Sequence, residues 1–196
     1  IEPVPDYQMD TSVSVPFIGA PAVWNPETYG VLGEGSKIGI IDSGIDYTHA
    51  DFGGSGNPDD YTQNDPTVIE PGTFPNDKVA GGWDFAGDIY NNGLPSPDPD
   101  PLDRGGHGTH VAGIAAGYGV LKDHSTYQGD YDPGMDMSRI LKGPGVAPKA
   151  ELFALKVIGP TYTGALLVPA MEWCLDPDGD GDYSDRMDAV NISLGV

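Results

Sequence analysis

Strand-like and helix-like segments alternate along this chain. The strand-like runs are bounded by Gly, Pro and Asp, and the helix-like runs lie between them. The expected strands are residues 37–42, 78–85, 150–158 and 188–194, and the expected helices are residues 107–118 and 164–175. Strands that alternate with helices predict an α/β domain built on a parallel sheet. Such sheets bind ligands at the carboxyl ends of their strands.

The segments between these elements are long and rich in Pro, Gly and Asp. The length of 196 residues suits one domain, or a large piece of one. We expect a lead-in at residues 1–36 with a short helix at Ala20–Trp24, surface insertions at residues 53–77 and 86–105, and an acidic loop at residues 176–185.

The charge is strongly negative, with 30 acidic against 9 basic side chains and a net charge of −21. Asp outnumbers Glu by 24 to 6, and many Asp residues adjoin Gly or Pro. This pattern favours turns, helix caps and cation ligands. It argues against a nucleic-acid partner, because a polyanion would be repelled. It fits a cation-loaded protein, a salt-adapted one or a soluble extracellular one.

The chain contains one cysteine, Cys174, so it cannot form an intrachain disulfide. The neighbours of this cysteine are apolar and helix-like, which predicts a place in the core. The sequence shows neither a signal-peptide pattern nor an apolar span of membrane length. We therefore expect a mature or trimmed product without a membrane span.

Two short motifs, 65 residues apart, contain the candidate catalytic residues. In Ile-Gly-Ile-Ile-Asp-Ser-Gly-Ile-Asp (residues 38–46), a buried strand delivers Asp42 into a turn. In Gly-His-Gly-Thr-His-Val-Ala-Gly (residues 106–113), a turn delivers His107 at the start of a helix. A carboxylate that orients a histidine forms two-thirds of a nucleophilic triad. The alternative for Asp42 is that its carboxylate only caps the following turn.

His107 and His110 are three residues apart and could share a helix face as a metal pair. The glycines around His107 favour a turn there instead, and the sequence lacks the Glu-bearing pattern of zinc peptidases. We therefore expect His110 to be a packed helix residue.

Both motifs resemble the Asp and His motifs of the subtilisin-like serine proteases, the subtilases, in the order that this family uses. Further similar segments are residues 78–85, residues 145–152 and the Asn-Ile-Ser-Leu-Gly string at residues 191–195. The resemblance runs from about residue 20 to the end and is strongest with large secreted bacterial subtilases. It implies a three-layer, doubly wound parallel sheet of which this chain forms the amino-terminal part, and a secreted protein.

The resemblance also assigns roles to residues. Asp42 would orient the imidazole, and His107 would act as general base and then as general acid. Ser193, Leu194 and Gly195 would line the cleft and pair with an extended polypeptide substrate as an added strand. Asp51 matches a position that binds calcium in some members of the family.

The nucleophile of the family lies in a Gly-Thr-Ser-Met-Ala-type segment, which this sequence does not contain. We therefore expect the remaining carboxy-terminal half of the protease domain to supply the serine and the oxyanion hole. The fragment alone should be inactive and should not fold stably. The alternatives are a catalytically inactive, subtilase-fold binding protein and a calcium-binding module.

The acidic loop places carboxylates on alternate residues with Gly between them, a spacing that can wrap Ca²⁺. It matches an EF-hand loop at its opening positions, but Met187 replaces the closing Glu, so that Asp185 or Asp188 would take this place. The alternative is a solvated Asp-Gly turn. The predicted ligands are Asp176, Asp178, Asp180, Asp182 and Asp185.

Overall fold

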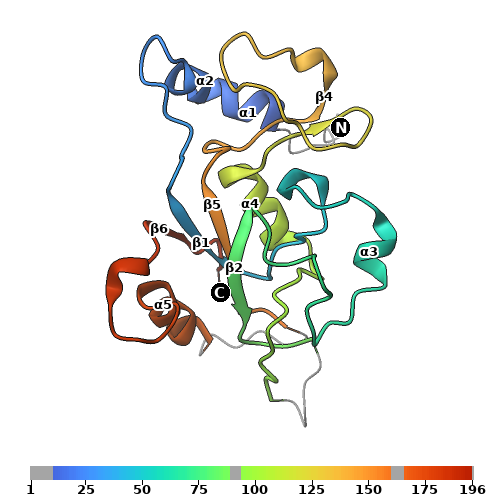
Figure 1. Cartoon of the computed structure of the whole chain (residues 1–196), viewed down its shortest axis with the longest axis vertical. Helices are drawn as coiled ribbons and strands as arrows, with labels where there is room; N and C mark the ends of the chain where they lie inside the picture. Colours follow the sequence, from blue (N-terminus) through green and yellow to red (C-terminus); the bar gives the residue numbers. More distant parts are fainter. Residues whose placement is uncertain (1–10, 89–93, 160–165, 196) are drawn as a thin grey trace, which may run out of the picture.

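The computed structural model describes residues 11–88, 94–159 and 166–195. Within them, the centre is a four-stranded sheet with the strand order β2–β5–β1–β6 (Figure 1). All three pairs of neighbouring strands are parallel, which confirms the predicted α/β class. The strands are β1 (Lys37–Asp42), β2 (Val79–Asp84), β5 (Glu151–Lys156) and β6 (Ala189–Asn191).

Strand β1 lies inside the sheet and ends at the candidate site. It pairs with β5 along its whole length, with Asp42 opposite Lys156, and with β6 on its other side. Ile40 and Ile41 are completely buried although they point to opposite faces. A strand that is covered on both faces reads as a continuous apolar run, and this explains the Ile-rich sequence before Asp42.

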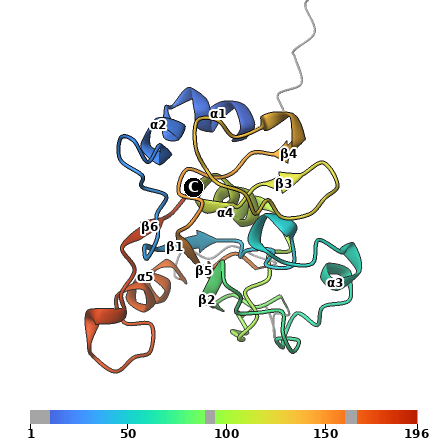
Figure 2. The same ribbon diagram turned by 45° about the horizontal axis from the view of Figure 1, so that its top comes forward.

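Two helices cover the two faces of the sheet (Figure 2). Helix α4 (His107–Ala116) packs Ala112 into the same buried cluster as Ile40. Helix α5 (Leu167–Leu175) packs Cys174 into the cluster of Ile41 on the opposite face. The predicted three-layer, doubly wound arrangement is confirmed. Cys174 lies in the core as predicted, and burial raises the pKa of its thiol to about 11.

Shorter elements surround these layers. Of the two helices of the lead-in, α1 packs against both α2 and β4 (Figure 1). A separate antiparallel pair is formed by β3 and β4. The elements are α1 (Thr11–Phe17), α2 (Ala20–Trp24), α3 (Pro58–Thr62), β3 (Val120–Leu121), β4 (Ile140–Lys142) and the 3₁₀ turns Ala50–Phe52, Met137–Arg139 and Tyr183–Asp185.

The boundaries of the elements differ from the sequence predictions at several places. The last strand was expected at residues 188–194, but β6 ends at Asn191 and the chain then leaves the sheet. Helix α5 begins at Leu167, and its expected start at residues 164–165 lies outside the described residues. The insertion at residues 53–77 contains the short helix α3, which was not predicted, because its five residues are too few to show a helical period.

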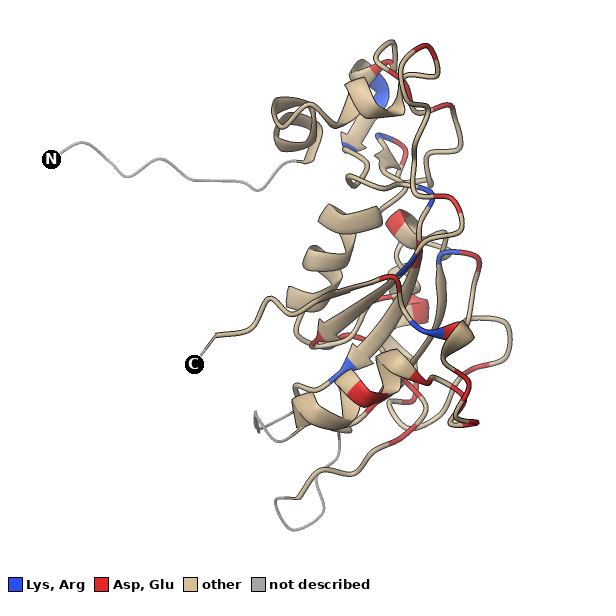
Figure 3. Ribbon diagram, turned by 90° about the vertical axis from the view of Figure 1, so that its left-hand side faces the viewer, with Lys and Arg blue, Asp and Glu red and all other residues tan. Residues whose placement is uncertain are grey.

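Acidic side chains lie mostly on the loops (Figure 3). An exception is a buried group at the ends of β2 and β5, where the ammonium of Lys156 lies 2.9 Å from Asp84 and 2.7 Å from Asp88. Burial lowers the pKa of Lys156, but the two carboxylates outweigh this effect and raise it overall. No helix among the described residues is long and apolar enough to cross a membrane.

Candidate active site

Asp42 is the last residue of β1, and its side chain is completely buried. Its Oδ1 accepts a hydrogen bond from the backbone N–H of Ser43 at 2.7 Å. Its Oδ2 has no hydrogen-bond partner among the described residues. A buried carboxylate needs strong compensation, so the second contact of Oδ1, with a histidine, is of particular interest.

His107 is the first residue of α4, and its Nδ1 lies 2.7 Å from Oδ1 of Asp42. An ionised carboxylate only accepts hydrogen bonds, so Nδ1 carries the proton and Nε2 is left as the free acceptor. The side chain of His107 is 56% exposed, whereas that of Asp42 is buried. The structure thus brings together the two residues of the sequence motifs, with the imidazole open to a reacting group.

Two glycines allow the start of α4 to lie directly against the end of β1. A Cβ atom on Gly108 would lie 2.2 Å from the carbonyl oxygen of Gly44 and 3.0 Å from Cβ of Asp42. Gly44 has a left-handed φ of 103°, and a Cβ there would lie 2.3 Å from the carbonyl of Pro101. The N–H of Gly108 also donates to Oγ of Ser43 at 2.9 Å. Only glycine permits this close approach, which sets the separation between Asp42 and His107.

Asp103 is a further residue of this region that sequence reasoning missed. It is 1% exposed, and its carboxylate accepts hydrogen bonds from the turn before His107 and from the first turn of α4. One pattern in the sequence could have indicated this role: an Asp shortly before a helix whose N-cap residue is Gly. Such a helix lacks a capping side chain at its N-cap and needs an acceptor from elsewhere.

Ser193, Leu194 and Gly195, predicted to line the cleft, follow the end of β6. The hydroxyl of Ser193 donates to Oδ1 of Asn191 at 2.8 Å, and the Leu194 side chain packs against the apolar cluster of α5. A Cβ on Gly195 would meet nothing within 4 Å. The three residues thus follow the last strand of the sheet directly, with Leu194 packed and Ser193 hydrogen-bonded.

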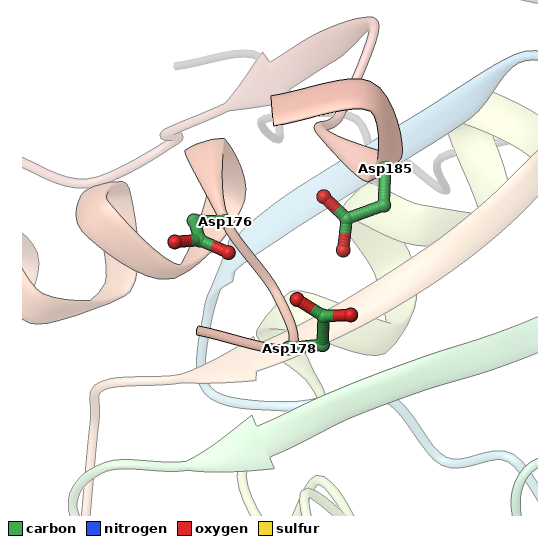
Figure 4. Close-up of side chains that lie close together, drawn as sticks. All are labelled: Asp176, Asp178 and Asp185. Carbon is green, nitrogen blue, oxygen red and sulfur yellow. The ribbon is translucent and has the colours of Figure 1, made fainter. Parts of the chain in front are cut away.

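Three carboxylates of the acidic loop converge. Ligand oxygens of Asp176, Asp178 and Asp185 all lie within 4.8 Å of one another, and Figure 4 shows their side chains turned toward a common space. One oxygen of Asp185 is buried and has no hydrogen-bond partner among the described residues. Hard carboxylate oxygens in this arrangement suit Ca²⁺.

Several negative charges lie close together in the acidic loop. The N–H of Asp180 lowers the pKa of Asp178, but partial desolvation and the charges of Asp180, Asp185 and Asp176 outweigh it, so that the pKa of Asp178 is raised. The structure places Asp180 and Asp182 outside the group of three. The carboxylate of Asp180 accepts from the N–H of Asp182, and that of Asp182 accepts from the N–H of Ser184.

Asp51 lies apart from the acidic loop, beside the end of α4. Its Oδ1 accepts from the N–H of Gly119 at 2.7 Å, and burial raises its pKa to about 6. A Cβ on Gly117 would lie 2.3 Å from its Oδ2. Among the described residues, Asp176, Asp178 and Asp185 form the only group of three His, Cys, Asp or Glu side chains close enough to share a metal ion, and Asp51, His107 and His110 belong to no such group.

The geometry and the comparisons agree on the class of protein. Residues 33–196 match the subtilase family of peptidases, which covers most of the chain. The chain belongs to the subtilase family, as the sequence motifs predicted.

Individual relatives are similar over most of this chain. The chain is 30% identical to the minor extracellular protease Vpr of Bacillus subtilis (strain 168), over 96% of this chain and 17% of that protein. It is 28% identical to subtilisin E of the same strain, over 97% of this chain and 34% of the relative. The CspB protease of Clostridium perfringens has a similar structure, with a TM-score of 0.50 and 27% identity over 89% of this chain and 31% of that chain. The chain thus spans about a third or less of each of these relatives.

Proposed function

We propose that this chain carries the Asp and His members of the triad of a subtilisin-type serine endopeptidase. The observation that supports the proposal most strongly is the 2.7 Å contact between Nδ1 of His107 and Oδ1 of Asp42. Asp42 would fix the tautomer of the ring and stabilise its protonated form. His107 would take the proton of the nucleophile at Nε2 and then give it to the leaving amine.

The nucleophilic serine would come from a part of the protease domain outside these 196 residues. The hydroxyl of Ser43 accepts a hydrogen bond from Gly108, and that of Ser193 donates one to Asn191, so neither of these bonds involves His107. Without that serine, the 196 residues alone would form no acyl-enzyme intermediate and would cleave no peptide.

A polypeptide would be the substrate, held in an extended form beside Ser193, Leu194 and Gly195. Their place directly after β6 supports the addition of a substrate strand there. The protein would act outside the cell. The support for this location is the relative that is named an extracellular protease, together with the net charge of −21.

A structural Ca²⁺ ion would be held by Asp176, Asp178 and Asp185. The convergence of their oxygens supports this site, because closely spaced carboxylates repel one another and a cation would relieve this repulsion. The ion would tie the end of α5 to the segment that leads into β6.

Labelling of the full-length protein with a fluorophosphonate probe tests the proposed activity. We expect labelling of the wild type and its loss in His107→Ala. His124→Asn is the control, because His124 is exposed and has a left-handed φ of 68° that Asn also adopts. Undiminished labelling of His107→Ala would refute the proposed role, and a wild type that takes no label would favour a non-catalytic member of the family.

A further inference from the structure

Asp103 is a buried carboxylate four residues before His107, and it accepts four hydrogen bonds. Its Oδ1 accepts from the N–H groups of Gly105 at 2.8 Å and Gly106 at 2.9 Å. Its Oδ2 accepts from the N–H of Thr109 at 2.9 Å and from the Thr109 hydroxyl at 2.6 Å. With 1% exposure, this side chain has little contact with water, and the four donors compensate its charge.

These bonds hold the backbone on both sides of His107. Gly106 precedes the histidine and Thr109 follows it, so one carboxylate fixes both flanks of the residue. The hydroxyl of Thr109 also accepts the N–H of Asp46 at 2.9 Å, in the loop that follows β1. The chain of contacts from Asp103 through Thr109 to Asp46 therefore joins the start of α4 to the loop after the strand that carries the orienting carboxylate.

The local structure of α4 explains why this carboxylate is needed. The N-cap residue is Gly106, which has a left-handed φ of 82° and no side chain to cap the helix. The first N–H groups of a helix need acceptors, and a negative charge is favourable at this end. The carboxylate of Asp103, in the preceding turn, supplies both an acceptor and a negative charge. It replaces a conventional cap while leaving the space next to His107 clear.

We infer that Asp103 is a positioning residue, which holds the His107 ring against Asp42 through the backbone of Gly106 and Thr109. It touches no reacting atom. Its consequence for catalysis rests on the proposed function, whereas its effect on the geometry of His107 does not.

The turn has a second attachment that does not depend on this carboxylate. The guanidinium of Arg104 donates to the carbonyl oxygens of Tyr61 and Asn64, both at 3.0 Å. The hydroxyl of Tyr61 donates to the backbone carbonyl of Asp103 at 3.1 Å. The segment at residues 53–77 thus keeps the turn in place when the Asp103 side chain is altered, so that variants of this side chain should still fold.

Three variants in the full-length protein test the inference. Asp103→Asn keeps the volume but turns an NH₂ group toward one of the two pairs of donors. Thr109→Val removes the hydroxyl that links Asp103 to Asp46, and Thr109→Ser retains it. Asp136→Asn is the matched control, because Asp136 accepts the N–H and hydroxyl of Ser138 in the same pattern in an exposed turn.

The first measurement is the low-field proton resonance of the Nδ1–H group of His107, in protein labelled with ¹⁵N-histidine. We expect Asp103→Asn and Thr109→Val to shift it upfield or to broaden it beyond detection, and Thr109→Ser and Asp136→Asn to keep it. An unchanged resonance in Asp103→Asn and Thr109→Val would overturn the inference, as would equal loss in Thr109→Ser and Thr109→Val.

The second measurement is peptide hydrolysis. We expect kcat to fall by about 10- to 100-fold in Asp103→Asn, because a small displacement of a catalytic group is costly. KM should stay within about two-fold of the wild-type value, since ground-state binding is untouched. A change in KM at constant kcat would overturn the inference. If the wild type cleaves no peptide, the proposed function fails, and the histidine resonance still decides the role of Asp103.

Discussion

Asp42 and the carboxylates of the acidic loop are held in place by different means. Asp42 is buried at the end of a central strand, and its partner His107 is 65 residues away in the sequence. The side chains of Asp176 and Asp178, in contrast, accept hydrogen bonds from nearby residues of their own loop. Both accept the N–H of Asp180, a few residues further along the chain.

The difference shows what each arrangement depends on. The position of Asp42 depends on the sheet, on helix α4 and on the glycines between them, so it should persist whether or not a ligand is present. In the loop, the described hydrogen bonds to the carboxylates of Asp176 and Asp178 come from nearby N–H groups. Lys37 donates to the backbone oxygen of Asp185, not to a carboxylate, so a bound cation should still change the stability of the loop. Variants at the two places therefore distinguish a site made by the fold from a site completed by an ion.

The largest expected effect comes from Asp42→Asn, which keeps the size of the side chain but removes its charge. Without the carboxylate, the ring of His107 is no longer held in the tautomer with a proton on Nδ1, and kcat should fall about 10⁴-fold. Steady-state hydrolysis by the full-length protein measures this. Asp123→Asn, in an exposed turn, is the control. A loss of less than about ten-fold would show that Asp42 only caps its turn.

Gly108→Ala should have the next largest effect, because it separates the two elements of the site. The added Cβ would lie 2.2 Å from the carbonyl oxygen of Gly44, so α4 must move away from β1. We expect a loss of about 2–3 kcal/mol in the free energy of unfolding, together with lost activity. Gly105→Ala is the control, since a Cβ there meets its neighbours at an ordinary 3.5 Å or more. Equal stability of the two variants in urea unfolding would contradict the close-packed site.

The predictable part of the site was the part encoded in local patterns. The run of apolar residues before Asp42 indicated a buried strand, and the glycines around His107 indicated a turn into a helix. Both expectations agree with β1 and with the start of α4. The chemistry of a carboxylate and a histidine suggested that the two residues pair, and the family resemblance supported this hypothesis, because no local pattern in a strand or a helix specifies the contact.

The features that the sequence did not reveal depend on contacts between segments. Helix α1 contains Pro16, which argues against a helix when it is read alone. Strands β3 and β4 are too short for alternation to be recognised. Asp103 reads as a loop residue, because its bonds cross a glycine turn to reach Thr109.

Removal of calcium tests the proposed ion site of the acidic loop. If Asp176, Asp178 and Asp185 hold Ca²⁺, the ion stabilises the folded state by about 2.7 kcal/mol at a concentration 100 times its Kd. A chelator should therefore lower the Tm of the wild type, and Asp178→Asn should remove most of this difference. Differential scanning calorimetry with and without the chelator measures both.

Asp132→Asn is the matched control, because Asp132 accepts a turn N–H from Gly134 on an exposed loop away from the group of three. It should keep the full response to the chelator. An unchanged Tm of the wild type in chelator would refute the calcium site and leave the loop as a solvated turn.

The smallest expected effect is a pH dependence of the stability that comes from Asp98. The charges of the buried residues Asp84 and Asp100 act on this side chain. Desolvation raises the pKa of Asp98 to about 6; the N–H of Asp100 opposes the shift, and the charges of Asp84 and Asp100 add to it. The folded state therefore binds more protons than the unfolded state between roughly pH 4 and 6, and the free energy of unfolding rises as the pH falls through this window.

The pKa shift from 3.8 to about 6 is roughly two units, or about 3 kcal/mol without screening, and about half of this is gained between pH 7 and pH 5. Solvent screening at this partly exposed side chain reduces the effect in that range to on the order of 0.5 kcal/mol. Urea unfolding of the wild type and Asp98→Asn, at about pH 7 and pH 5, isolates this contribution from the other carboxylates. The wild type should gain more stability at the lower pH than the variant. Parallel behaviour of the two proteins would show that Asp98 is solvated like the carboxylates of the exposed loops.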